Sequence, residues 1–255
     1  MNNQHIFKFT TDISSVGMPE QLNNPFALDT PEIVRVAVKE FQDFLSIESQ
    51  RWAFDLQVEK GKMYGVLVVQ QADGSYVYLG TNSGKLPRNA TCDQFIPSVF
   101  DDSTDDYFIN RGMAELSEIG SRIKATTNQC EREELTEIRK QRSFAIQQQL
   151  FESYLFLNLH GSVKNVLQIF KHSSHGNPPA AAGECAAPKL LQYALKHQLK
   201  PIAIAEFWWG KPSKNKERAH KNFYPACKDK CRPILEYMLC NAELFNKASA
   251  LHACV

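Results

Sequence analysis

The stretch over residues 183–231 constrains the fold more than any other part of the chain. Pro188 suits the first turn of a helix, where its missing N–H removes no hydrogen bond, so Cys185 lies just before or at a helix start. Residues 202–209 form a short, mostly apolar run that is typical of a buried strand. Pro225 suits the start of a second helix. The stretch therefore predicts helix, strand and helix, with thiols at both helix N-termini.

Three cysteines of this stretch form the candidate metal site. Cys227 and Cys231 are four residues apart, so on one helix both thiols would project from the same side. Backbone N–H groups and the helix dipole favour thiolate at a helix N-terminus. Thiolates of Cys185, Cys227 and Cys231 could hold zinc with one coordination position open. The alternative is that all three are buried, reduced cysteines that pack as small apolar groups.

Composition is that of an ordinary globular chain. Its 255 residues are 43% hydrophobic, enough for a sizeable core in one large domain or two small ones. The net charge of +1 points to no class of partner for the chain as a whole. No signal-peptide pattern and no apolar run of membrane-spanning length occurs. With an odd count of seven cysteines, these features predict a cytoplasmic protein with reduced thiols and no membrane association.

We expect one principal domain in this chain. Residues 1–28 are polar and irregular and predict a flexible arm, residues 29–240 a single α/β domain, and residues 241–255 a tail. Within the domain, residues at about 111–160 are rich in Glu, Arg, Lys and Gln with a narrow apolar stripe, which predicts a long helical hairpin insertion. The fold class expected is a small mixed sheet flanked by helices.

The first half of the domain shows a strand pair. Residues 63–69 and 76–79 are apolar and β-branched or aromatic, and a turn over residues 72–74 separates them. Residues 80–84 contain two glycines without the spacing of a phosphate-binding loop, so we expect a turn there. A helix is expected before this pair, with Pro31 in its first position and an apolar face that is structural.

A basic segment lies between residues 211 and 232. It carries eight lysines and arginines against two acidic residues, a net charge of about +6, with aromatic residues interleaved. Such a segment suits a phosphate backbone and stacked bases, although a solvated loop is the alternative. The candidate nucleic-acid contacts are Lys211, Lys214, Lys216, Arg218, Lys221, Lys228 and Lys230.

Several stretches together resemble a known family. They are residues 61–69, 183–191, 205–210 and 223–239. They are similar to the long N-terminal region of bacterial RluA-type RNA pseudouridine synthases, and the resemblance covers about residues 29–238. It implies an RNA-modification context, with ribosomal or transfer RNA as the partner.

The departure from that family concerns its chemistry. Its catalytic aspartate lies in an Arg-Leu-Asp motif of a separate C-terminal domain, and the sequence contains no Arg-Leu-Asp. No catalytic residue is therefore carried over, and the resemblance implies RNA as the context without implying isomerase activity for this chain. The resemblance implies an RNA-binding or accessory domain, or a structural domain that docks onto a separate pseudouridine synthase.

A weaker resemblance is to the cytidine deaminase fold. There a His or Cys two residues before a Glu begins one helix, and Pro-Cys-x-x-Cys begins the next. Cys185 would match the first motif, but Ala187 stands where the proton-shuttling glutamate would be, and the second motif has three spacer residues instead of two. Hydrolytic deamination would then need Glu184 or Glu206 as a substitute. This resemblance implies zinc as cofactor and the helical hairpin as an insertion.

Overall fold

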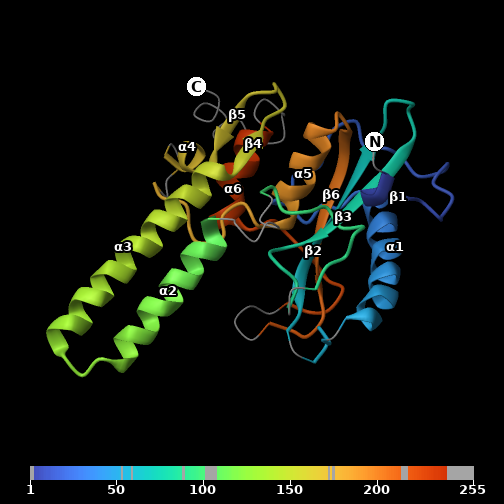
Figure 1. The fold of residues 1–255 in the computed structure, drawn as a ribbon. Helices are drawn as coiled ribbons and strands as arrows, with labels where there is room; N and C mark the ends of the chain where they lie inside the picture. The colour runs from blue at the N-terminus through green and yellow to red at the C-terminus, as the bar shows by residue number, and fades with distance from the viewer. Residues whose placement is uncertain are drawn as a thin grey trace.

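The computed structural model describes residues 3–52, 54–58, 60–87, 90–100, 108–171, 173, 176–213 and 218–239. In this part the protein is a mixed α/β structure with six α-helices and a five-stranded antiparallel sheet (Figure 1). The strands are β1 (Phe7–Lys8), β2 (Lys62–Gln70), β3 (Tyr76–Asn82), β6 (Lys200–Trp209) and β7 (Phe223–Tyr224). A separate pair consists of β4 (Leu155–Leu157) and β5 (Val163–Asn165). The helices are α1 (Glu32–Glu48), α2 (Phe108–Ala125), α3 (Gln129–Ser153), α4 (Val166–Lys171), α5 (Ala186–Lys196) and α6 (Lys228–Met238).

Strand β2 is the centre of the sheet, whose order is β1-β3-β2-β6-β7. Its interior residues are all buried, because helices cover both faces of the sheet. The turn to β3 is stabilised by Asp73, whose carboxylate accepts hydrogen bonds from the backbone and hydroxyl of Ser75. The pairing of β2 with β6 shifts register between Val68 and Val69.

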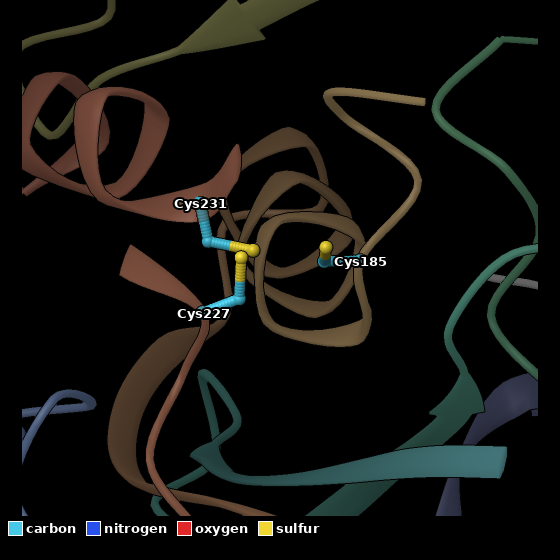
Figure 2. A group of neighbouring side chains, drawn as sticks. All are labelled: Cys185, Cys227 and Cys231. Carbon is cyan, nitrogen blue, oxygen red and sulfur yellow. The ribbon is translucent and has the colours of Figure 1, made fainter. Parts of the chain in front are cut away.

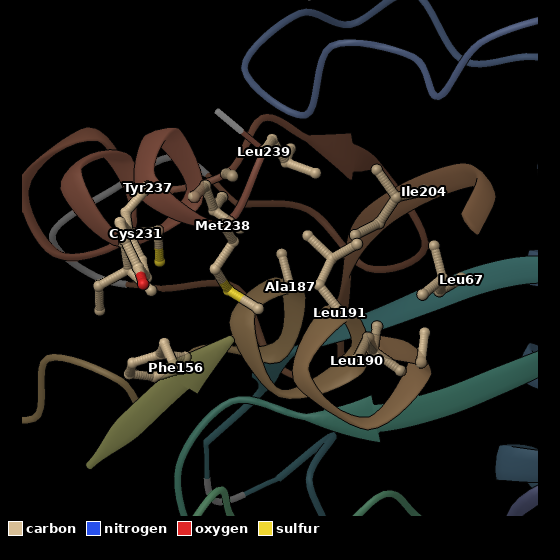
Figure 3. Close-up of a cluster of buried hydrophobic side chains, with 14 of the residues drawn as sticks. Leu67, Phe156, Ala187, Leu190, Leu191, Ile204, Cys231, Tyr237, Met238 and Leu239 are labelled. Carbon is tan, nitrogen blue, oxygen red and sulfur yellow. The ribbon is translucent and has the colours of Figure 1, made fainter. Parts of the chain in front are cut away.

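Alternate residues of each strand serve two separate cores, as the two-residue period of a strand requires. On one face α1 packs Ile33 and Phe41 against a layer that includes Val66 and Phe207. On the other face α5 packs Leu190 against Leu67 and Ile204, and α6 packs on α5 (Figure 3). The fold is therefore helix, sheet and helix in layers, with α5 between the sheet and α6.

Helices α2 and α3 lie side by side and project away from the sheet (Figure 1). Gly112 allows their close approach, since a Cβ added there would be 2.5 Å from Cδ1 of Ile146. The guanidinium of Arg142 donates to the carboxylate of Glu115 at 2.8 Å across the pair. Asn128 caps α3 by accepting from the backbone N–H groups of Cys130 and Glu131. Among the described residues no helix combines the length and apolarity needed to cross a membrane.

Two expectations about local structure are wrong. Helix α3 ends at Ser153, where the expected helical region ran to about residue 160, because residues 155–157 pair with β5. Strand β3 continues through Asn82, where a turn was expected over residues 80–84, because residues 80–82 pair with β2. Gly80 is in this strand because the ring of Phe41 leaves no room for a side chain: an added Cβ would lie 2.3 Å from it.

The N-terminal segment, expected to form a flexible arm over residues 1–28, packs on the domain at Phe7, Lys8 and Asn23. Phe7 is buried, and Phe7 and Lys8 pair with β3. The Asn23 side chain accepts from the Ile204 backbone N–H at 2.8 Å and donates to the Ile204 carbonyl at 3.0 Å. These contacts are long-range in sequence, which is why composition did not indicate them. The expected tail, residues 241–255, lies outside the described residues.

Candidate metal centre

The sulfur atoms of Cys185, Cys227 and Cys231 all lie within 4.8 Å of one another. Cys185 is the N-cap of α5, Cys227 is the N-cap of α6, and Cys231 lies in the first turn of α6. Figure 2 shows these side chains where the N-terminal ends of the two helices meet. Cys231 is buried, and Cys185 and Cys227 are half-buried. Two helix starts therefore bring three thiols to one point.

Helix α6 begins at Lys228, three residues later than Pro225, where the sequence predicted its start. Phe223 and Tyr224 pair with β6, so the chain stays extended until Cys227. As N-cap, Cys227 accepts a hydrogen bond from the Lys230 backbone N–H, with an N···S distance of 3.2 Å. The sulfur thus replaces the usual oxygen acceptor at a helix start.

Small residues allow α5 to begin close to the sheet. Gly65 faces the helix, and a Cβ added there would lie 2.8 Å from Cβ of Ala186 and 3.0 Å from Cδ1 of Leu190. Glu206 is the β6 partner of Gly65, and its carboxylate accepts a hydrogen bond of 3.0 Å from the Ala187 backbone N–H. This bond ties the first turn of α5 to the strand beneath it and fixes the position of Cys185.

The three thiols have different proton affinities. Hydrogen bonds from the Cys185 and Cys231 thiols hold the pKa of Cys227 far below its usual value, and the backbone N–H groups of Lys230 and Cys231 add to this. The hydrogen bond to Cys227 raises the pKa of Cys185 to about 12, and burial adds to the rise. The hydrogen bonds with Cys185 and Cys227, together with burial, raise the pKa of Cys231 well above its usual value. The cluster therefore favours one thiolate, at Cys227, beside two protonated thiols.

The donor set fits zinc. Zn–S bonds of about 2.3 Å in a tetrahedral site place sulfurs about 3.8 Å apart. Separations of up to 4.8 Å need only small side-chain adjustments to reach that geometry. Cys185, Cys227 and Cys231 would be the ligands, and three thiolates leave the fourth tetrahedral position open to water or another ligand.

Glu206 is a buried carboxylate that interacts electrostatically with this cluster. It is 8% exposed, and burial raises its pKa to about 7, although the Ala187 N–H opposes the rise. Its charge is felt by Cys185 and Cys231, whose pKa values it helps to raise. A carboxyl group with a pKa near neutrality can both accept and donate a proton.

A small cavity borders Glu206. It has a volume of about 10 Å³, room for about one water molecule, and Ala187, Tyr224 and residues 25–30 are among its walls. The N-terminal segment is held beside this cavity: the Pro25 carbonyl accepts from the Ala226 N–H at 2.8 Å, and Arg232 lies over the Phe26 ring. This segment therefore forms one wall of the space next to Glu206.

The basic segment is placed differently from what its composition suggested. The Arg218 guanidinium lies over the rings of Trp208 and Tyr224, at 5.3 and 5.7 Å from their centres. Lys221 lies over Trp209, and the Lys211 ammonium donates to the Val58 carbonyl at 2.9 Å. These three cations therefore make contacts within the protein, and both tryptophans are buried.

The remaining candidate contacts divide into two groups. Lys228 is exposed and Lys230 is half-buried, both in the first turn of α6 beside the thiols. Lys214 and Lys216 lie outside the described residues.

Sequence reasoning missed Lys189. This lysine is 3% exposed, and burial lowers its pKa to about 8, although the negative charge of Glu184 opposes the drop. It lies one helical turn after Cys185, between buried alanines and leucines of α5. A lysine at an apolar helix position was the available signal, since lysine is seldom fully buried.

Comparisons with protein-family models, curated proteins and solved structures gave no match to this chain.

Proposed function

We propose that Cys185, Cys227 and Cys231 bind zinc, and that the protein is a zinc-dependent hydrolase of deaminase type. The observation that supports this most directly is the convergence of three sulfurs within 4.8 Å at two helix starts. Helix N-termini favour the thiolates that zinc needs. The order of β3, β2 and β6, with α5 and α6 carrying the cysteines, supports a deaminase-like arrangement in which α2 and α3 are an insertion.

Glu206 takes the role of proton carrier in this proposal. A zinc ion in a site with three protein ligands lowers the pKa of its bound water to about 7 and so supplies a nucleophile. Beside such a site, Glu206 would hold and release a proton, because its own pKa is about 7. The Ala187 N–H donates to this carboxylate, which supports Glu206 in the role that a glutamate at position 187 would have.

Metal analysis of the purified chain tests the proposal. We expect about one zinc per chain, and close to none in Cys231→Ser, because a two-thiolate site loses most of its affinity. Cys130→Ser is the matched control, since Cys130 is an exposed cysteine on α3 and its replacement should leave zinc bound. A wild-type protein that folds without zinc and does not take it up would contradict the proposal.

We also propose an RNA-modification role in the lineage of RluA-type pseudouridine synthases, with RNA as the partner. The exposed Lys228, beside the thiol cluster, supports this together with the resemblance of the sequence. Binding to transfer or ribosomal RNA fragments should weaken steeply as salt rises, since each phosphate contact releases counterions. Absence of binding at low salt, or an affinity independent of salt, would refute it.

A further inference from the structure

A second cavity lies on the other side of α5 from the small space at Glu206. It has a volume of about 310 Å³, within the range of small-molecule sites. Its walls come from the start of the chain, from residues 96–99 and from α5 with the residue after it. The side chains that matter here are His5, Lys189, Tyr193, Lys196 and His197.

The charges on this cavity have one sign. Lys189 and Lys196 are lysines, His5 and His197 are histidines, and no carboxylate is among the described residues that line it. The pKa of His197 is lowered by burial and by the positive charges of Lys196, His5 and the N-terminus. Such a wall attracts an anion and disfavours a cation.

Lys189 is the feature that indicates a ligand. It is 3% exposed, yet it lines the cavity, and its ammonium forms no hydrogen bond or ion pair with any described residue. Glu184 supplies the negative charge that acts on it, but Glu184 is not part of the cavity wall. Nδ1 of His5 is also buried without a hydrogen-bond partner among the described residues. A buried polar atom without a partner costs stability, so His5 Nδ1 favours a ligand that pairs with it.

Aromatic rings lie beside the lysines in this wall, since Tyr193 follows Lys189 by one turn of α5 and His197 directly follows Lys196. The Tyr193 and His197 rings have centres 4.1 Å apart, and His5 meets Tyr193 edge to face at 5.6 Å. Flat side chains of this kind can stack on the organic part of a ligand while the lysines take its charged end.

We infer that this cavity binds a small phosphorylated molecule, with its phosphate on Lys189 and Lys196 and its organic part against Tyr193. A lysine ammonium is a common phosphate binder and acts as a point charge, so no fixed bidentate geometry is needed. This site is separate from the zinc ligands and does not depend on the proposed hydrolysis.

Calorimetric titration of the full chain with uridine 5′-monophosphate, adenosine 5′-monophosphate and inorganic phosphate tests the inference. We expect saturable binding of at least one nucleotide, tighter than that of inorganic phosphate. Lys189→Met keeps the length and burial of the side chain without its charge and should raise Kd about tenfold or more. Lys200→Met is the matched control, because Lys200 is exposed at the start of β6, outside the cavity, and its replacement should leave Kd unchanged.

Two further measurements keep the outcome clear. If Lys189→Met does not fold, Lys196→Ala, at an exposed position, should still raise Kd several-fold. Absence of saturable binding by all three compounds overturns the inference, as does an unchanged Kd in Lys189→Met or in Lys196→Ala. Binding of an RNA oligonucleotide at this cavity without binding of either nucleotide would overturn it too, and would assign the cavity to a phosphodiester backbone.

Discussion

The thiol cluster and the basic segment overlap in the sequence, since Cys227 and Cys231 lie within residues 211–232. They differ in how far their residue types determine where the side chains lie. Both contain residues that suggested chemistry before the structure was known. The three cysteines lie at helix N-termini, and the structure brings their sulfurs within 4.8 Å. The cations of the basic segment are divided: Arg218 is half-buried over the Trp208 and Tyr224 rings, whereas Lys221, over the Trp209 ring, and Lys228 are exposed.

The difference lies in what constrains each side chain. A cysteine is short, so its sulfur follows the backbone, and a helix start defines that backbone within a few residues. A lysine or arginine is long and amphipathic, so its charge can cover a buried ring or extend into water from the same backbone position. Cysteine spacing therefore predicts a location, whereas basic composition predicts only a charge.

The largest expected effect concerns zinc and stability. Removal of zinc with a chelator should lower the melting temperature by more than about 5 °C, because metal binding to the folded state contributes to folding free energy. Thermal unfolding before and after chelation, with re-addition of zinc as the control, measures this. An unchanged melting temperature would show that the three cysteines only pack as small apolar groups. Their spacing would then predict a location without a metal site.

Glu206→Gln should change how stability depends on pH. The pKa of Glu206 is about 7 in the folded protein against 4.5 in the unfolded chain, so the folded state binds more protons between these values. Stability from this group is present below pH 4.5 and is lost as pH rises to about 7. The loss is about 3 kcal/mol in wild type and absent in Glu206→Gln.

Urea unfolding of the metal-free proteins at pH 5 and pH 7.5 measures this difference. If the unfolding free energy changed equally in the two proteins between pH 5 and pH 7.5, Glu206 would be ionised in the folded state and could not act as proton carrier.

Gly65→Ala tests whether close packing of α5 sets the thiol geometry. The new Cβ would lie 2.8 Å from Cβ of Ala186, which is fixed to the backbone, so α5 must move outward. We expect a loss of about 1–3 kcal/mol in unfolding free energy together with weaker zinc binding. Gly17→Ala is the matched control, since no atom lies within 4 Å of its Cβ position. Unchanged zinc affinity in Gly65→Ala would show that the positions of the three thiols do not depend on how closely α5 packs on β2.

The smallest effects concern the basic segment. Arg218→Ala should cost about 1 kcal/mol of stability, because two ring contacts are lost. Lys228→Ala should leave stability unchanged and, if RNA binds here, lower the salt dependence of its affinity by about one phosphate contact. Paired denaturation and RNA titration of the two variants measure this. A loss of stability in Lys228→Ala, with a reduced salt dependence of RNA binding in Arg218→Ala, would show that Lys228 has the structural role and Arg218 contacts RNA.

Much of the fold could be predicted from local patterns. The apolar runs of β2 and β6 are buried strands, and the helices after Pro31 and around Pro188 form where their start signals lie. Glu206 could be named because it lies in the strand between the two thiol-bearing helices.

The remainder depended on contacts between distant segments. Pairing of Phe223 and Tyr224 with β6 delays the start of α6, and no local signal indicates that pairing. The covering of Glu206 by residues 25–30 likewise comes from tertiary packing. Lys189 was overlooked because a lysine in a helix normally reaches water, and only the packing around α5 shows that this one does not.

The two hydrogen bonds between the Asn23 amide and the backbone of Ile204 show that the N-terminal segment covers an edge of the sheet. The Asn23 side chain pairs with the N–H and C=O of Ile204 that a neighbouring strand would otherwise bind. A version of the protein trimmed to residue 29 would leave that edge bare, and bare sheet edges recruit strands from other molecules. Such a truncated chain should self-associate even though its helices and its cysteines are intact.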